Sequence, residues 1–157
     1  MSKIKTFKKF NDVIFEYIIN DDIESIKNYI ESGYDLNTQD NIGHYTALIY
    51  AAKNNKIKIT KLLLNAGADL NLKDFDGHTA LTRAAQNNNI GIVKLLLNSG
   101  VDFNEKDNNG NTALIWAISN NNIEIVKLLL NAGIDFNNQN DDGNTALLIA
   151  ATGDNYE

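Results

Sequence analysis

The chain has 157 residues with 20 acidic and 14 basic side chains, a formal net charge of −6, and no cysteine. The lack of cysteine excludes a disulfide framework and a thiolate zinc site, and no stretch approaches the roughly 20 apolar residues that a membrane-spanning helix needs. Lysines give the first ten residues a charge of +4, so residues 11–157 carry −10, a charge that would repel nucleic acid and complement a basic protein surface.

Residues 1–11 form a basic N-terminal arm that has no continuous apolar run. We expect a solvated tail without a function of its own and without a secretory signal. The chain is therefore predicted to be an intracellular, cytoplasmic protein that does not bind membranes.

The next segment, residues 12–39, is predicted to hold two short helices. Asp12 stands at the position of a helix N-cap, and Asp21 stands where the first helix ends. Gly33 follows the second helix, where a left-handed residue is expected. Because polar side chains are spread over both helices, we expect this unit to be the N-terminal capping repeat.

From residue 46 onward the sequence repeats with a period of 33 residues. Thr-Ala-Leu begins at Thr46, Thr79, Thr112 and Thr145. Each threonine hydroxyl can accept a hydrogen bond from an unpaired backbone N–H, so each copy predicts a first helix of about eight residues. These helices are expected to end at residues that tolerate a left-handed conformation, Asn55, Asn88 and Asn121. Second helices are predicted over Ile57–Leu64, Ile90–Leu97 and Ile123–Leu130, followed by Gly67, Gly100 and Gly133.

The third copy reads Asp74-Phe-Asp-Gly77-His-Thr79-Ala-Leu81, then Ala84-Ala85, then Ile92-Val93-Lys-Leu95-Leu96-Leu97 and Gly100. This pattern resembles the ankyrin repeat, and the neighbouring copies match it almost position for position. The resemblance implies an all-α repeat solenoid of helix-turn-helix units joined by hairpin-like fingers, here a single solenoid over residues 12–157. After the capping repeat we expect full repeats at 40–73, 74–106 and 107–139 and a partial repeat at 140–157.

The chain departs from the family pattern Thr-Pro-Leu-His in every copy. Alanine replaces proline, and the histidine is replaced by Ile49, Thr82, Ile115 and Leu148. The hydrogen bonds that this histidine makes between neighbouring repeats in the family therefore cannot be carried over. We expect apolar packing at positions 49, 115 and 148 to take their place.

The second finger contains one extra residue. Two residues, His44 and Tyr45, separate Gly43 from Thr46, whereas one residue separates the equivalent pair in the later fingers. The extra residue is either a tolerated loop insertion or a device by which Tyr45 extends the binding edge.

The sequence gives no support for metal binding or catalysis. Two finger segments resemble the start of a calcium loop, but Trp116 and Ile149 stand where that loop needs its last carboxylate. The two histidines, His44 and His78, lie on adjacent fingers with no cysteine nucleophile and no recurring partner, so we expect exposed finger residues. No enzymatic activity, metal or cofactor is predicted.

The resemblance places one variable residue of each first helix in the concave groove of the solenoid. This column reads Tyr50, Arg83, Trp116 and Ile149. Tyr, Arg and Trp are enriched at binding hot spots because they combine apolar area with a polar group, so the column predicts a protein-binding groove. We expect Trp116 to be exposed there; the alternative is that it packs on a neighbouring helix. The next column, which widens the groove, holds Lys53, Gln86, Ser119 and Thr152.

The finger tips extend this predicted surface. They are Asn41 and Ile42, Phe75 and Asp76, Asn108 and Asn109, and Asp141 and Asp142. An aromatic residue on a polar turn, such as Phe75, has little structural purpose. We therefore expect a non-catalytic module that binds a protein partner through the two columns, the tips and the flanking residues His44, Tyr45 and His78. The alternative is a scaffold or spacer segment of a larger repeat protein, with no partner of its own.

The last unit begins at Thr145 with a first helix, and the given sequence stops at Glu157, where its second helix would begin. A terminal repeat needs a polar outer side, which this unit lacks. We expect a fragment of a longer array, or a last helix covered by another chain, including self-association through the partial repeat.

Overall fold

The computed structural model describes residues 13–153, so the predicted basic arm and the Asp12 cap lie outside the described residues. Within them the chain forms paired helices and no sheet, with an isolated antiparallel bridge between Gln139 and Thr145. The helices are α1 (Val13–Ile19), α2 (Ile23–Glu31), α3 (Ala47–Lys53), α4 (Ile57–Asn65), α5 (Ala80–Gln86), α6 (Ile90–Asn98), α7 (Ala113–Ser119), α8 (Ile123–Ala132) and α9 (Ala146–Gly153). The predicted all-α repeat architecture is confirmed.

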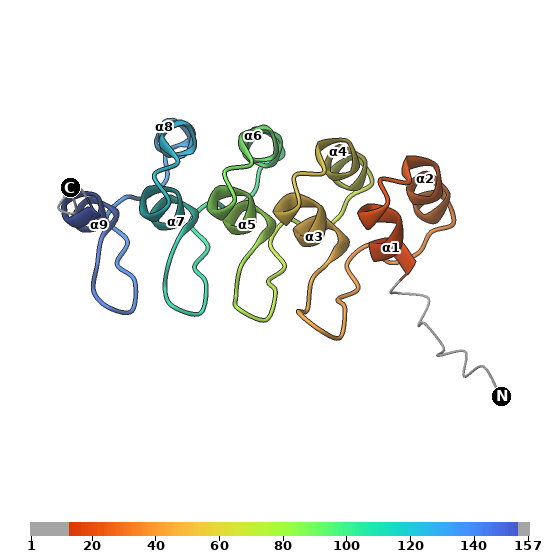
Figure 1. Ribbon diagram of the computed structural model, residues 1–157, viewed down its shortest axis with the longest axis horizontal. Coiled ribbons are helices and arrows are strands. Elements are labelled where there is room, and N and C mark those ends of the chain that lie inside the picture. The colour runs from red at the N-terminus through yellow and green to blue at the C-terminus, as the bar shows by residue number, and fades with distance from the viewer. Residues whose placement is uncertain (1–12, 154–157) are drawn as a thin grey trace.

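The helices stand in two rows (Figure 1). The first helices α1, α3, α5, α7 and α9 form one row, and the second helices α2, α4, α6 and α8 form the other. Long loops project from the first row on the side opposite the second helices. We call them finger 2 (residues 39–46), finger 3 (73–79), finger 4 (106–112) and finger 5 (139–145). In the described part of the chain, no helix is both long and apolar enough to cross a membrane.

Threonine caps start the first helices, as the sequence predicts. The Thr46 hydroxyl accepts a hydrogen bond from the backbone N–H of Ile49 at 3.2 Å, and Thr112 accepts one from Ile115 at 3.4 Å. Thr79 and Thr145 make the same bond in their own repeats. A cap of this kind stabilises a helix by about 1 kcal/mol, which matters for helices of seven or eight residues.

Left-handed residues turn each first helix into its second helix. Asn55, Asn88 and Asn121 have φ angles of 55°, 57° and 55°, and Asp21 has 52°. This conformation lets the chain reverse within a few residues, so that the two helices of a repeat pack side by side. Gly133, which ends the second helix α8, also has a left-handed conformation, with φ at 89°.

The repeated apolar residues build one core along the stack. Leu48, Leu81 and Leu114, the leucines of the first three Thr-Ala-Leu copies, are at most 1% exposed. The second helices contribute Ile59, Ile92, Ile125, Leu63, Leu96 and Leu129, all fully buried. Burying each such side chain contributes about 1.5–3 kcal/mol, so the burial of these repeated apolar residues stabilises the fold.

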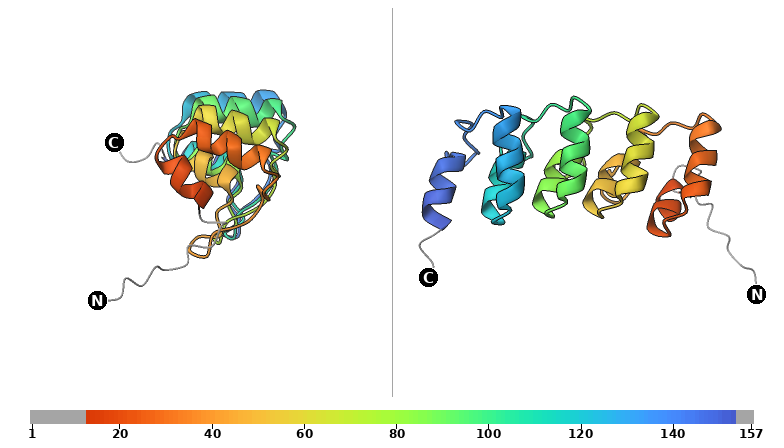
Figure 2. Two further views of the ribbon diagram at one scale, coloured as in Figure 1. Left: turned by 90° about the vertical axis from the view of Figure 1, so that its right-hand side faces the viewer. Right: turned by 90° about the horizontal axis from the view of Figure 1, so that it is seen from above.

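The expected replacement of the family histidine by apolar packing holds in two of the three positions. Ile49 and Ile115 are buried, at 1% and 3% exposure. Leu148 is 47% exposed, so the expectation is wrong there. Within residues 13–153 no helix follows α9, so no following helix covers this side chain (Figure 2).

Buried asparagines link neighbouring repeats, a role that sequence reasoning missed. The Asn89 side-chain amide donates to the carbonyl of Ala52 at 2.8 Å, and the Asn122 amide donates to the carbonyl of Ala85 at 2.8 Å. Both asparagines precede a second helix and bond to the end of the preceding repeat's first helix. These bonds satisfy helix-terminal carbonyls that would otherwise be buried without a partner.

Candidate protein-binding surface

Each later finger is organised by the side chain at its start. One oxygen of Asp74 accepts hydrogen bonds from the backbone N–H groups of Asp76 and His78, at 3.1 and 2.9 Å. Asp107 does the same for Asn109 and Asn111, and Asn140 for Asp142 and Asn144. In each segment that resembled a calcium loop, one of the candidate ligand oxygens, on Asp107 or Asn140, therefore binds backbone N–H groups. Among the described residues, no cluster of histidine, aspartate and glutamate could hold a metal ion.

Adjacent fingers are hydrogen-bonded to one another through their backbones. The N–H of Phe75 donates to the carbonyl of Gly43 at 2.9 Å, Asn108 to Asp76 at 3.0 Å, and Asp141 to Asn109 at 3.0 Å. At Gly77 the next finger comes so close that a Cβ would lie 2.7 Å from the backbone nitrogen of Asn108. The four fingers thus form a continuous, preformed row.

Arg83, predicted to be a groove residue, is buried and bound to its own finger. Its side chain is 9% exposed, and its Nε donates to Asp74 at 2.6 Å while Nη2 donates to Asp76 at 2.8 Å. Burial alone would lower the pKa of Arg83, but the hydrogen bonds to both aspartates outweigh it and raise that pKa. The arginine remains charged and holds finger 3 against α5. A third bond, from Nη1, goes to Gln86 at 3.1 Å.

Trp116 occupies the equivalent position in the next repeat and likewise binds the aspartate at the start of its own finger. Its Nε1 donates to the second oxygen of Asp107 at 2.7 Å, and the ring is half-buried rather than exposed. The packing alternative also needs revision, because Trp116 is bonded to its own finger and its ring meets His78 edge-on at 5.4 Å between centroids. A recurring pairing could have revealed this: the donor stands nine residues after the aspartate in both repeats.

His78 is 4% exposed, so the prediction of an exposed finger residue is wrong. It is enclosed between finger 4 and α7, where its Nδ1 lies 3.5 Å from Asp107 Oδ2 and has no hydrogen-bond partner. Burial lowers the pKa of His78, and the neighbouring Arg83 cation lowers it further against the opposing effect of Asp74, Asp107 and Asp76. The imidazole is therefore neutral near pH 7 and cannot serve as a surface cation.

The inserted residue of finger 2 changes its support. The Tyr45 ring lies against Gly43 so closely that a Cβ there would collide with it. Lys53 donates to the Tyr45 hydroxyl at 2.9 Å, and the Tyr45 ring meets Tyr50 edge-on at 6.0 Å. Tyr50 also packs on Phe15 at 5.6 Å, so both tyrosines are partly buried beneath the finger.

The exposed members of the predicted set lie at the tips. Phe75 is 69% exposed, and the exposed His44 meets it edge-on at 5.9 Å. Ile42, at 95%, is exposed even more. Ile149 and Gln86 are half-buried on the first-helix row. The structure thus separates the predicted set into residues that hold the fingers and residues that face solvent.

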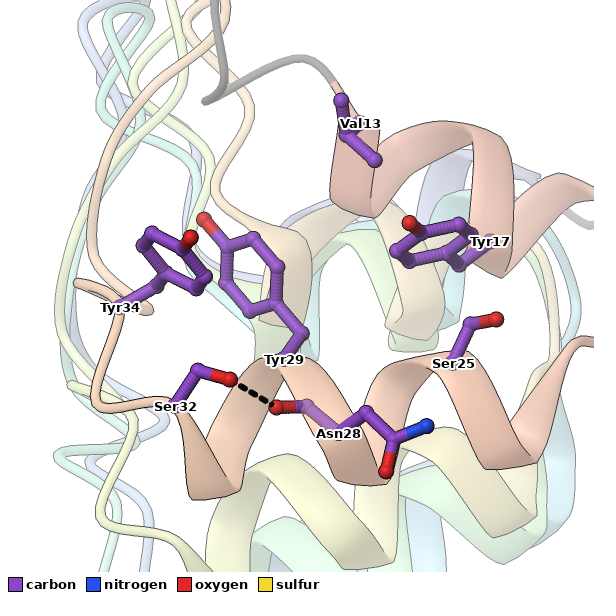
Figure 3. Close-up of a pocket in the computed structure, with 7 residues that line it drawn as sticks. All are labelled: Val13, Tyr17, Ser25, Asn28, Tyr29, Ser32 and Tyr34. Atoms are coloured by element: carbon purple, nitrogen blue, oxygen red, sulfur yellow. Dashed lines mark hydrogen bonds between the residues drawn. The ribbon is translucent and has the colours of Figure 1, made fainter.

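A hollow of about 350 Å³ lies elsewhere, on the outer side of the first repeat between α1 and α2 (Figure 3). It is lined by Val13, Tyr17, Ser25, Asn28, Tyr29, Ser32 and Tyr34. The lining includes no histidine, carboxylate or amine, and the Ser32 hydroxyl is bonded to the carbonyl of Asn28 at 2.7 Å. The titratable side chains of this lining are tyrosines, and burial raises the pKa of Tyr29 above its ordinary value.

Comparison with known proteins agrees with this architecture. A family model described as ankyrin repeats, in three copies, matches residues 14–107 and 91–157. An ankyrin repeat protein of fowlpox virus (strain NVSL) is 34% identical over 72 residues, which are 46% of this chain and 17% of that relative. The match thus spans a small part of the relative's length. Ankyrin repeats are generally protein–protein interaction modules and typically non-catalytic. With its family model covering the helical units described above, this chain belongs to the ankyrin repeat family.

Proposed function

We propose that this chain is a non-catalytic module that binds a partner protein through the concave side of its first helices and the tips of its fingers. The observation that carries the proposal is that side chains of the first helices hold the fingers in place while an exposed aromatic residue faces solvent. Arg83 and Trp116 fix their fingers to the first helices, while Phe75 stays 69% exposed on the surface that they hold in place. A preformed surface loses little conformational entropy on binding, and an exposed aromatic side chain on it offers apolar area to a partner.

The charge of the fingers favours a partner with a basic surface. Asp74 and Asp107 are buried and Asp76 is paired with Arg83, so the finger charge open to a partner lies mainly on the exposed Asp141 and Asp142. Charge complementarity of this kind increases association rates and selects partners. The same acidic row would repel the phosphates of nucleic acid.

The predicted site residues divide by role. Tyr50, Tyr45 and His78 shape the surface from beneath, as do Arg83 and Trp116. His44 and Phe75 contact the partner directly. Lys53, Gln86 and Ile149 lie on the first-helix row and form the base of the groove.

The experiment is a binding assay with an identified partner. Replacing Phe75 and His44 by alanine should weaken binding at least about tenfold, since a buried aromatic contact contributes more than 1.4 kcal/mol. Lys61→Ala, on the exposed side of α4, is the matched control and should leave affinity unchanged. Unchanged affinity in the Phe75 and His44 variants, and also in Tyr50→Ala and Gln86→Ala, with the fold intact would reject the proposed surface.

A second contact, self-association through the last unit, is supported by α9. Leu147 is 74% exposed, whereas its equivalent Leu114 is 1% exposed. An apolar side chain left in water at a position that other repeats bury favours contact with another chain. Sedimentation over a range of concentrations tests this. A concentration-independent monomer would reject self-association and leave the scaffold or spacer role for this end.

A further inference from the structure

The tips of the four fingers change in character along the stack. Finger 2 presents Ile42 at 95% exposure, and finger 3 presents Phe75 at 69%. Finger 4 presents only amides, and finger 5 presents only carboxylates. The exposed residues of these last two tips are Asn108, Asn109, Asp141 and Asp142. The row therefore has an apolar end and an acidic end.

The extra residue of finger 2 shapes the apolar end. It places His44 in a left-handed conformation with φ at 53°, which is uncommon for a residue with a side chain. In that conformation the His44 ring rests edge-on against Phe75, and the neighbouring Gly43 carbonyl accepts the Phe75 N–H. Ile42 precedes Gly43 at the tip. We call Ile42, His44 and Phe75 the tip cluster.

The tip cluster stands on a fixed base. Tyr45 packs directly against Gly43, and Lys53 on α3 bonds to the Tyr45 hydroxyl. Below finger 3, Arg83 binds the two aspartates that flank Phe75. Both tips are therefore held by side chains of the first helices, so a partner need not order them.

The acidic end differs in its charge balance. The Asp76 carboxylate near Phe75 is paired with Arg83 at 2.8 Å. Asp141 and Asp142 are exposed and form no ion pair with another described residue. Uncompensated negative charge is thus concentrated on finger 5.

We propose that the row of tips of fingers 2 to 5, the tip row, binds a linear segment of the partner. This segment carries a bulky apolar residue and, further along, lysine or arginine. The apolar residue sits on the tip cluster, and the basic residues lie opposite Asp141 and Asp142. This inference rests on the proposed function and adds the partner's chemistry and its direction along the fingers. The apolar contact supplies most of the affinity, because exposed ion pairs contribute little, and the charges fix the orientation.

The test is selection of a random linear-peptide display library on the full chain, followed by affinity measurements with the recovered peptides. Ile42→Asn combined with Phe75→Asn should weaken binding at least about tenfold. Asp141→Asn combined with Asp142→Asn should weaken it a few-fold, and should remove most of its salt dependence. Ile123→Asn, which replaces a 55% exposed isoleucine at the start of α8, away from the fingers, is the control and should bind like the wild type.

The remaining outcomes separate this inference from the proposed function. If recovered peptides bind the tip variant normally but lose affinity in Tyr50→Ala or Gln86→Ala, the tip row is wrong and the groove stands. If no peptide is enriched, the linear-segment inference is rejected and the proposed function still depends on the assay with an identified partner. If no finger or groove variant affects the binding of an enriched peptide, both are rejected. Circular dichroism of every variant shows whether a loss reflects unfolding.

Discussion

The first and last described repeats differ in the polarity of the residues that they expose at positions buried in the inner repeats. Inner repeats bury Ala51, Ile59 and Ala68, but the first repeat has Tyr17, Ser25 and Tyr34 at these positions, on its outer side (Figure 3). At the other end α9 keeps apolar residues at the repeat's apolar positions, and Leu147 and Leu148 are 74% and 47% exposed.

The difference teaches that a few substitutions decide whether a repeat face meets water or another helix. Hydroxyls and an amide on the first repeat can hydrogen-bond to solvent, so that end is adapted to exposure. The last unit has no such adaptation. The predicted capping role of the first repeat remains a proposal, which the contrast supports.

The largest expected effect comes from the same substitution in two repeats. Leu114→Ala removes a side chain that is 1% exposed and should lower the free energy of unfolding by about 2–5 kcal/mol. Leu147→Ala removes one that is 74% exposed and should change it by less than about 0.5 kcal/mol. Urea unfolding followed by circular dichroism measures both. Equal losses would mean that α9 is covered in solution.

The links between repeats should also differ along the stack. Asn122→Ala leaves the buried carbonyl of Ala85 without its partner, which should cost about 1–3 kcal/mol of unfolding free energy. At the first link the equivalent residue is Lys56, whose ammonium group pairs with the exposed Asp21 at 2.7 Å. Lys56→Ala should cost at most about 1 kcal/mol. Urea unfolding measures both variants. An equal loss of unfolding free energy in Lys56→Ala and Asn122→Ala would contradict the predicted difference between the links.

Acid should weaken the inner junction formed by His78. Because its pKa is lowered in the folded state, the unfolded chain takes up the proton first, below the ordinary pKa of about 6.5. The free energy of unfolding should therefore fall as pH decreases from about 7 toward 5, and stop falling from this cause once the folded pKa is passed. The groups facing His78 are Arg83, Asp74, Asp76 and Asp107.

His78→Asn, which installs the residue found at the equivalent positions 111 and 144, should flatten this pH dependence. His44→Gln, on the exposed tip, is the matched control and should keep it. Trp116 is the chain's single tryptophan and touches His78, so its fluorescence reports on this junction directly. If His78→Asn kept the wild-type dependence of stability on pH, His78 would not be the cause of the loss of stability in acid.

The smallest effect on stability is expected from rebuilding the outer face of the first repeat. Ser25→Ile with Asn28→Leu restores the residues of the inner repeats. It removes the hydrogen bond from the Ser25 hydroxyl to Asp22 but keeps the backbone N–H bond of this cap, so the free energy of unfolding should change by no more than about 1 kcal/mol. The same variant should associate more strongly with itself, since it exposes new apolar area. Sedimentation velocity compares it with the wild type; an unaltered profile would show that polarity at these two positions does not control association.

Much of the fold could be predicted from the sequence because local rules repeat without conflict. Threonine caps, left-handed asparagines and the 33-residue spacing of buried leucines all point to the same units. The roles of Arg83 and Trp116 could not be read from their types, because hot-spot residues and buried donors look alike in sequence. What decides between them is the aspartate nine residues earlier, whose second oxygen needs a donor.

The exposed tips could be predicted better than the buried histidine. Phe75 and the tip polar residues follow a turn pattern that keeps side chains in solvent. His78 has the same type as the exposed His44, and its burial depends on packing by the next finger and Trp116. That packing is a contact between repeats, which the pattern within one repeat does not contain.

The central claim is that the tips bind the partner while Arg83 and Trp116 hold the fingers. It is tested most directly by measuring, for one recovered peptide, the dissociation constants and thermal midpoints of Phe75→Asn and Trp116→Phe beside the wild type. The account predicts at least about tenfold weaker binding with an unchanged midpoint for Phe75→Asn, and a lowered midpoint for Trp116→Phe because Asp107 loses its donor. Normal peptide affinity in a folded Phe75→Asn variant would contradict it.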